Sequence, residues 1–544
     1  IDQQPINAVN EVIPVVYRST DRFPLSYSQN RIWFIDHLND GSPEYNMVSA
    51  FAINRKYSSE QLSSAFSKVI EKHTALRTTF HEEDGIPFQQ IQQDYKFSMD
   101  ALIIDSKCAN ELVDKRNEII AKESLYNFDI SAELLIRAKY LSLCVNGITE
   151  ENVLVVNIHH IAFDGWSLAI LIRELNNALQ MQNSGKSDVL QYVDYASFQR
   201  QQSNYSNDNE HVAYWLNKLA DLPDVHSIPL DFERTPGNKP RAKFVKQALS
   251  CELSEYVYQT ARHNDMTLFM LVHAALALLL SRHGDNSDIA VGMPVANRPK
   301  RCLESTIGFF VNTLVLMLDC DFQTIEQLFS AVKRVNQDAL TYQDVPFEYL
   351  VEQLCVDRNS THNPLFQIML SQNVLAVEDI RLGEEQTRVI ELEQSIAKYD
   401  LELAINETVE GIRLDWTYNA ELFSDARIQQ FSQHLSRILQ GLCVNKHSLL
   451  ADINMYSEEE LRKIIEHNAN GDNYSLSDNE QIHHLFEQNA MEAPQKIALE
   501  FNSDSISYGE LNSRANKLAQ LLTTKQSLMG AVVGVCMSRT DDML

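Results

Sequence analysis

The sequence lacks the features that mark several common classes of protein. Its eight cysteines are scattered and none belongs to a C-x-x-C pair, which argues against a disulfide framework and a zinc site. The longest apolar run, Met270–Leu280, is too short to span a bilayer, and the N-terminus does not have the basic and then apolar order of a signal peptide. Scattered, reduced thiols favour a cytoplasmic protein.

Positive charge is also scarce. Lys and Arg total 46 against 74 Asp and Glu, which gives a formal net charge of −28 at pH 7. Nucleic acids and anionic membranes are bound through basic patches. We therefore expect neither to be the main partner of this protein.

The length leaves room for three or four ordinary domains, or for two large ones and a piece, because the chain has 544 residues. It begins at Ile1 and stops just after the strand-like run Gly530–Met537. We expect it to be a segment of a longer polypeptide. Strand-like and helix-like patterns alternate throughout, which predicts an α/β fold.

Two adjacent stretches illustrate this alternation. Ser58 and Gln61 form a capping-box pattern that begins an amphipathic helix. The pattern of the following run, 74–80, predicts a strand with Arg77 on its polar side.

The densest chemistry lies in "VLVVNIHHIAFDGWSLAILIREL", residues 153–175. A continuous apolar run predicts a strand buried on both faces, and the residues after Gly165 predict a helix. Adjacent histidines on extended backbone point to opposite sides. We therefore expect His160 to project into a cleft as a general base and His159 to pack inward and hold the turn.

Asp164 and Gly165 stand where the helix begins. A buried carboxylate needs a cationic or multi-donor partner, and Arg77 is the partner we predict for Asp164 in a structural ion pair. Glycine at position 165 tolerates unusual dihedral angles and lets a substrate approach the backbone.

Other interpretations of the histidines remain open at this point. A histidine at a strand end is often structural, and His483-His484 is a second adjacent pair with no evident chemistry. No third and fourth metal ligand is visible at suitable spacing, so no metal is expected. A serine nucleophile elbow is disfavoured because Ala169 stands where its second glycine should be.

The pattern H-H-x-x-x-D-G resembles that of the condensation domains of nonribosomal peptide synthetases, within the wider chloramphenicol acetyltransferase-like superfamily. Six further stretches resemble the other family motifs in the same order: Leu25–Leu38, Lys72–Phe80, Tyr192–Arg200, Ile307–Leu316, Tyr342–Val351 and Asn359–Leu370. The departures are Thr74 for a usual glutamate, Phe198 for a tryptophan and Tyr342 for a histidine. They concern substrate detail rather than the family.

The resemblance implies a fold of two chloramphenicol acetyltransferase-like subdomains arranged as a V-shaped pseudo-dimer, with His160 in a tunnel between them. Upstream donor and downstream acceptor carrier proteins would insert phosphopantetheine arms, and no cofactor would be bound directly. An acceptor amine would attack a donor thioester to form a peptide bond. His160 would accept a proton or stabilise the charged intermediate. Asn312, Trp166 and Ser167 would position the substrate.

The expected domain organisation has five parts. They are a linker at 1–20, the N-terminal subdomain at 21–200, the C-terminal subdomain at 201–455, a second linker at 456–480 and a fragment at 481–544. The last part resembles the beginning of an adenylation domain and stops before any phosphate-binding loop. It should therefore behave as an incomplete domain.

Three alternatives accompany the condensation hypothesis. One is a non-catalytic module of the same fold that binds carrier proteins, and another is an epimerisation-type relative. The third is a free-standing acyl-CoA transferase. Intact His160, Asp164 and Gly165 weigh against the first, and the adjacent adenylation-like segment weighs against the other two. The sequence leans weakly towards an L-configured donor and does not identify the amino acids that are joined.

Overall fold

The computed structural model describes residues 13–16, 22–38, 41, 43–53, 57–180, 190–202, 209–235, 240–298, 300–354, 362–373, 381–382, 385–390, 396–443, 447–469, 482–501, 504–525 and 534. The chain divides into two compact units, Ile1–Tyr456 and Ser457–Leu544. We describe each unit by itself.

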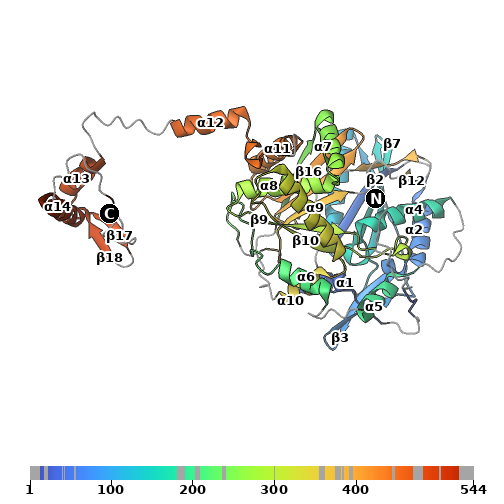
Figure 1. Ribbon diagram of the computed structural model, residues 1–544. Helices are drawn as coiled ribbons and strands as arrows, with labels where there is room; N and C mark the ends of the chain where they lie inside the picture. Colours follow the sequence, from blue (N-terminus) through green and yellow to red (C-terminus); the bar gives the residue numbers. More distant parts are fainter. Residues whose placement is uncertain are drawn as a thin grey trace. The chain divides into compact units, whose positions relative to one another are not determined.

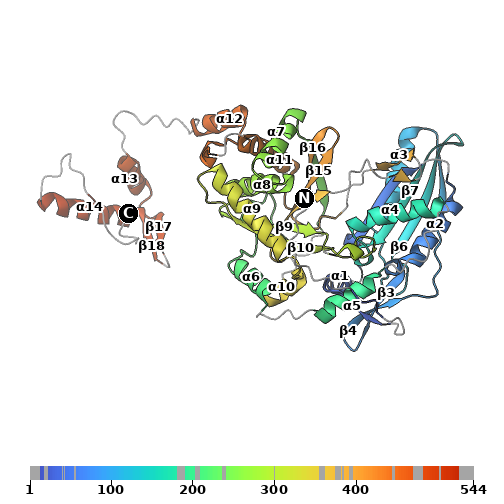
Figure 2. The same ribbon diagram turned by 45° about the vertical axis from the view of Figure 1, so that its right-hand side comes forward.

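The first unit contains two α/β lobes. The first lobe is built on a five-stranded sheet of order β14-β2-β7-β6-β5, in which β7 (Ile148–His159) is central. Alternate β7 residues pack on opposite faces: Leu154 and Val156 lie with helices α2 and α4, whereas Val153 and Val155 lie with α3. The sheet is therefore covered on both sides, as the continuous apolar run predicts. Figure 2 shows α2 and α4 over one of its faces.

The bounds of the first lobe's other elements are β2 (Asn46–Ile53), α2 (Ser59–Lys72), β5 (Asp100–Ser106), α3 (Ala109–Ser124), β6 (Ile136–Val145), α4 (Gly165–Leu179) and β14 (Arg388–Ile390). A three-stranded sheet lies beside it, of order β1 (Phe23–Pro24), β4 (Ile86–Ile91) and β3 (Thr78–Glu83). Two helices, α1 (Tyr27–Leu38) and α5 (Tyr192–Gln202), complete this part of the chain.

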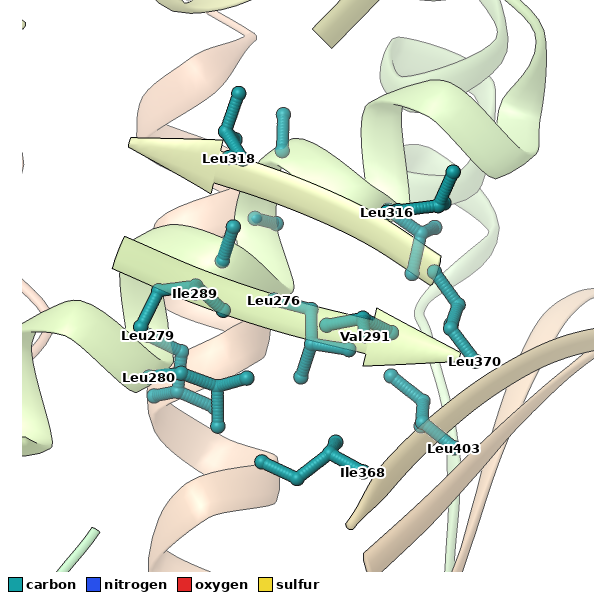
Figure 3. Packing of buried hydrophobic residues seen from close by; sticks show 14 of the residues in the cluster. Leu276, Leu279, Leu280, Ile289, Val291, Leu316, Leu318, Ile368, Leu370 and Leu403 are labelled. Atoms are coloured by element: carbon teal, nitrogen blue, oxygen red, sulfur yellow. The ribbon is translucent and has the colours of Figure 1, made fainter. Parts of the chain in front are cut away.

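The second lobe is built on a six-stranded sheet of order β10-β9-β11-β15-β16-β8. Helix α8 (Leu268–His283) is apolar almost all round and is buried against the sheet, which explains its sequence. Figure 3 shows Leu276, Leu279 and Leu280 of α8 beside Ile289 and Val291 of β9.

The bounds of the second lobe's other elements are α6 (Glu210–Lys218), β8 (Ala242–Ala248), α7 (Cys251–His263), β9 (Asp288–Val295), β10 (Asn312–Asp319), α9 (Ile325–Thr341), α10 (Phe347–Gln353), β11 (Ile368–Asn373), β15 (Leu401–Thr408), β16 (Gly411–Asn419) and α11 (Asp425–Leu442). Figure 1 shows these elements coloured along the chain. The α/β fold class is confirmed.

Two segments from the second half of the chain join the first lobe. Strand β14 pairs antiparallel with β2, and it follows a short hairpin of β12 (Arg381–Leu382) and β13 (Glu385–Gln386). Leu303, Ile307 and Phe310 are buried in the apolar core of the first lobe. The predicted boundary between the subdomains, at 200/201, therefore separates the two sheets only in part, because β14 lies after this boundary and still belongs to the first sheet.

The second unit is small. It contains α12 (Glu458–Ala469), α13 (Ile482–Glu492), a hairpin of β17 (Ile497–Phe501) and β18 (Asp504–Ser507), and α14 (Tyr508–Lys525). Apolar side chains are more than half exposed at Met491, Ile497, Leu518 and Leu521. The predicted strand within 530–537 lies almost entirely outside the described residues.

The local sequence predictions succeed in part. The capping box of Ser58 and Gln61 is present at the start of α2. The run 74–80 is not one strand: Thr74–Arg77 forms a 3-10 helix, and β3 begins at Thr78. Thr78 donates its hydroxyl hydrogen to the Thr74 carbonyl, a local bond that competes with the extended conformation.

In the described ranges, no single helix is long and apolar enough to cross a membrane. One bent pair, Cys251–His263 with Leu268–His283, passes the same test of length and composition, with 105° between its helices.

We predict that the protein loses stability in acid partly through His273. This fully buried residue of α8 accepts a hydrogen bond from the Asn336 amide on Nδ1, and burial lowers its pKa to about 4. The unfolded chain binds the proton near pH 6.5, so stability falls as pH drops from 6.5 towards 4, by about 3 kcal/mol from this group. His273→Leu should flatten the pH dependence of the unfolding free energy in chemical denaturation.

The control is His263→Leu, because His263 is exposed on α7. It should leave the pH dependence as it is in the wild type. An equally steep loss of stability in His273→Leu and the wild type would contradict the assignment.

Candidate functional site

His159 ends β7 and faces inward. It is 1% exposed, and its ring lies 5.8 Å from the ring of Phe128 and 6.4 Å from that of Tyr45. Its Nδ1 accepts a hydrogen bond from the Ile161 amide at 3.4 Å, so Nε2 carries the hydrogen. His159 thus packs beneath the turn, as its position on extended backbone predicts.

His160 begins the short 3-10 helix His160–Ala162 and is only half-buried. Its Nδ1 lies 2.8 Å from the Phe163 carbonyl oxygen, which can only accept, so Nδ1 carries the hydrogen. Nε2 therefore presents a lone pair, and among the described residues it has no hydrogen-bond partner. The edge of Phe309 packs against the ring, at 4.8 Å between centroids.

Both imidazoles are neutral near pH 7. Burial, followed by the positive charge of Lys398, lowers the pKa of His159 and of His160 to about 3. A neutral His160 with a fixed tautomer can accept a hydrogen bond from a protonated nitrogen of a substrate at Nε2.

Asp164 is fully buried and is the N-cap of α4. Its Oδ1 accepts hydrogen bonds from the amide of Ser167 at 2.8 Å and from the hydroxyl of Ser167 at 2.7 Å. Its Oδ2 accepts one from the amide of Phe310 at 3.1 Å. The carboxylate thus joins the start of α4 to a segment more than 140 residues away.

The ion-pair partner of Asp164 is Arg298, so the predicted partner, Arg77, is wrong. Arg298 Nη2 lies 3.0 Å from both carboxylate oxygens, and both side chains are almost completely buried. Arg77 instead donates to the Gln92 carbonyl at 2.5 Å and lies 5.4 Å from the Tyr95 ring. The prediction failed because Arg77 leaves the chain from a 3-10 helix rather than from the polar side of a strand.

Arg298 organises the loop that follows β9. Its Nη1 donates to the carbonyl oxygens of Leu303 and Thr306, each at 2.6 Å, and its guanidinium lies 4.0 Å from the Phe310 ring. Burial lowers its pKa, and Asp164 acts in the opposite direction. The available sequence signal was an arginine between a buried strand and the Ile307–Leu316 motif.

Ser167 and Trp166 support the same loop. Ser167 is fully buried, and its hydroxyl lies within hydrogen-bond distance of Asp164, Arg298 and the backbone of Gly308. The hydroxyl of Ser167 thus holds the loop, and its predicted part in positioning the substrate stays a prediction. Trp166 is 41% exposed and donates its indole hydrogen to the Glu304 carbonyl, and its predicted part in positioning the substrate stays a prediction.

Asn312 also serves the backbone. Its Nδ2 donates to the carbonyl oxygens of Gln343 and Val345 at 2.9 and 2.8 Å, and its Oδ1 accepts from the Phe347 amide at 3.0 Å. Both of its donor hydrogens are thereby used, and the residue is 4% exposed. Asn312 therefore positions the start of α10, and its predicted part in positioning the substrate stays a prediction.

Gly165 is the first residue of α4 and does not have a positive φ, so its backbone conformation does not itself require glycine. A Cβ placed at Gly165 would meet no atom within 4 Å. The glycine therefore borders open space and lies close to His160 in the sequence. Within the described ranges, no three His, Cys, Asp or Glu side chains are grouped so that they could hold a metal ion.

Comparison with known proteins identifies the family. A model described as "Condensation domain" matches residues 19–465. Gramicidin S synthase 2 from Brevibacillus brevis is 30% identical over 527 residues, which cover 96% of this chain and 12% of that protein. Malpinin synthetase from Mortierella alpina is 31% identical over 547 residues, which cover 99% of this chain and 7% of that protein. The chain belongs to the condensation domain family of nonribosomal peptide synthetases, and it spans about a tenth of the length of these curated relatives.

Solved structures show the same fold. A four-domain nonribosomal peptide synthetase bound to AMP and glycine aligns with a TM-score of 0.73 and 22% identity, over 94% of this chain and 39% of the other. The X-domain from teicoplanin biosynthesis aligns with a TM-score of 0.70 and 22% identity, over 81% and 99%. At these identities the likeness concerns the fold alone.

We predict strong energetic coupling between Asp164 and Arg298. Removal of one partner leaves a buried charge uncompensated, which costs roughly 3–5 kcal/mol. Asp164→Asn and Arg298→Met should each destabilise the fold, and the double variant should cost far less than their sum in a cycle of unfolding free energies.

The matched control pairs Asp164→Asn with Arg77→Met, whose effects should add. Additive effects for Asp164 and Arg298, or coupling in the control pair, would contradict the ion-pair assignment.

Proposed function

We propose that this chain forms an amide bond between two thioester-bound acyl groups. Membership of the condensation domain family supports this, and one observation carries it: His160 presents the Nε2 lone pair of a neutral imidazole with a fixed tautomer. The upstream donor carrier protein would present an acyl or peptidyl thioester, and the downstream acceptor carrier protein an aminoacyl thioester. Phosphopantetheine arms of these carriers are the substrate carriers.

The reaction balances without a cofactor. The acceptor amine attacks the donor carbonyl carbon, the C–N bond forms, the C–S bond breaks, and the thiolate leaves with the donor arm. The nitrogen loses a proton, which passes through His160 Nε2 to the departing sulfur. Because a thioester is already activated, the protein contributes mainly positioning and proton management.

The low pKa of His160 defines how it acts. Complete protonation of this imidazole is costly before reaction, since its pKa is about 3. His160 therefore first accepts a hydrogen bond from the amine and orients its lone pair. Negative charge on the tetrahedral oxygen then favours the proton on the ring.

The segment after the linker keeps its proposed identity as the N-terminal fragment of an adenylation domain. The match to gramicidin S synthase 2 covers 96% of the chain, more than the family match at 19–465. We accordingly propose that the rest of an adenylation domain is a partner of this chain in a longer synthetase.

Carrier proteins loaded with defined aminoacyl groups test the function. Mass spectrometry of the acceptor carrier should show a dipeptidyl thioester. Inverted stereochemistry without a new bond would indicate an epimerisation-type relative, and use of acyl-CoA in place of the donor carrier would indicate a free-standing transferase. Carrier binding without any product would indicate a non-catalytic module.

The two histidines should respond oppositely to substitution. His160→Ala should reduce the single-turnover rate of amide formation by roughly 100- to 10,000-fold with the unfolding free energy unchanged. His159→Ala removes a fully buried ring between two aromatic side chains and should cost about 2–4 kcal/mol in stability. Denaturation and rate measurements on both variants check this, and the reverse pattern would refute the assignment.

Gly165→Val should separate folding from activity. A Cβ at position 165 meets no atom within 4 Å, so we expect the melting temperature to change little. The side chain would occupy open space near the turn that carries His159 and His160, which we call the histidine turn, and we expect at least a tenfold loss of kcat/KM. Gly441→Ala is the contrasting variant: its Cβ would lie 2.6 Å from Ile453, so it should lower stability and leave the activity of folded protein intact. An unchanged rate in Gly165→Val would place the substrate elsewhere.

A further inference from the structure

A group of ionisable side chains beside the histidine turn is not used in the proposed reaction. Each of them is only half-buried. They come from several parts of the chain: Arg31 of α1, Glu44 and Tyr45 of the 3-10 helix Pro43–Tyr45, Glu348 of α10, and Lys398, Tyr399 and Glu402 at or near the start of β15.

The two cations of this group differ in how their charge is balanced. Arg31 lies 3.6 Å from the Glu348 carboxylate and 5.2 Å from the Phe347 ring. Lys398 Nζ lies 5.8 Å from the centre of the Tyr45 ring, and among the described residues no carboxylate comes within 4 Å of it. Glu402 and Glu44 act on Lys398 only from a greater distance.

Tyr45 connects Lys398 to the histidines. The Tyr45 ring faces the His159 ring at 6.4 Å, and the next residue, Asn46, pairs with His159 between β2 and β7. Lys398 is thus separated from His159 by the Tyr45 ring alone, and His159 immediately precedes His160. The charge of Lys398 disfavours a second positive charge nearby, and it contributes to the lowered pKa of both histidines.

We propose that Lys398 is a positioning residue of the amide-forming reaction, whose ammonium favours the uncharged form of the amine that attacks beside His160. This inference rests on the proposed function. Only the uncharged amine has the lone pair that forms the C–N bond, and only the uncharged imidazole can take the proton that this nitrogen then loses. Burial lowers the pKa of Lys398, Glu402 and Glu44 act in the opposite direction, and Arg31 acts in the same direction as burial. The ionisable groups that act on His160 are Lys398 and His159.

The pH dependence of the reaction tests the proposal. Single-turnover rates are measured between pH 5.5 and 9 on the full chain. The probes are carrier proteins loaded with N-acetylated donors and free-amine acceptors drawn from the protein amino acids. The acid limb of the profile reports protonation of the bound amine. In Lys398→Met this limb should move to higher pH by roughly one unit, the effect of a unit charge at about 10 Å in a medium of effective dielectric constant about 20.

Three variants serve as controls. Lys398→Arg keeps the charge and should keep the wild-type limb. Tyr45→Phe keeps the ring that supports the ammonium and should also keep the limb. Lys246→Met removes an exposed lysine of β8 and should change nothing. Circular dichroism confirms that each variant is folded, and a purely structural role of Lys398 would lower the rate at every pH without moving the limb.

The outcomes separate the two claims. Suppose that the wild type forms product and that the acid limbs of wild type, Lys398→Met and Lys398→Arg superimpose. This result would overturn the role of Lys398 and leave the proposed function standing. The absence of product for every loaded pair would overturn the proposed function, and this inference with it. If Lys398→Met does not fold, Lys398→Gln is used in its place.

Discussion

The buried ion pair of Asp164 and Arg298 is the interaction on which the site depends. One carboxylate caps α4, holds the loop that follows β9 and accepts the Phe310 amide. A buried charge pair is costly to assemble, and here its remaining hydrogen-bonding groups are largely satisfied by Ser167 and by backbone carbonyls. The pair therefore fixes one arrangement of the histidine turn against a segment from the second half of the chain.

At the histidine turn, strand geometry gives the adjacent residues His159 and His160 different roles. β7 is covered on both faces, so consecutive side chains at its end point to opposite sides. His159 fills an aromatic pocket, whereas His160 is held by the Phe163 carbonyl and keeps its Nε2 lone pair accessible. Burial and the charge of Lys398 lower the pKa of both rings and keep them neutral. Neutrality, tautomer and exposure of one imidazole thus follow from the way the strand ends.

Sequence reasoning predicted the parts of this protein that are encoded locally. The buried strand before His159, the helix after Gly165 and the capping box at Ser58 depend on neighbours in the sequence, and all three are present. The partner of Asp164 depends on how distant segments meet, so the prediction of Arg77 failed. Asn312 shows the same limit: its position in a motif was recognisable, whereas its three backbone bonds are visible only in the fold. Strand β14 and Phe310 belong to the second half of the chain but lie in the first lobe. No periodic pattern in the sequence indicates this placement.

A crystal structure with a stable substrate mimic would test the central claim most directly. The mimic would be a stable analogue of the product, in which the donor acyl group is joined by an amide to the aminoacyl group on the acceptor phosphopantetheine arm. The account predicts the amide nitrogen about 3 Å from His160 Nε2, next to the open space at Gly165, with His160 Nδ1 still bonded to the Phe163 carbonyl. An amide nitrogen bound out of reach of His160, or a His160 ring turned so that Nδ1 faces it, would contradict the account.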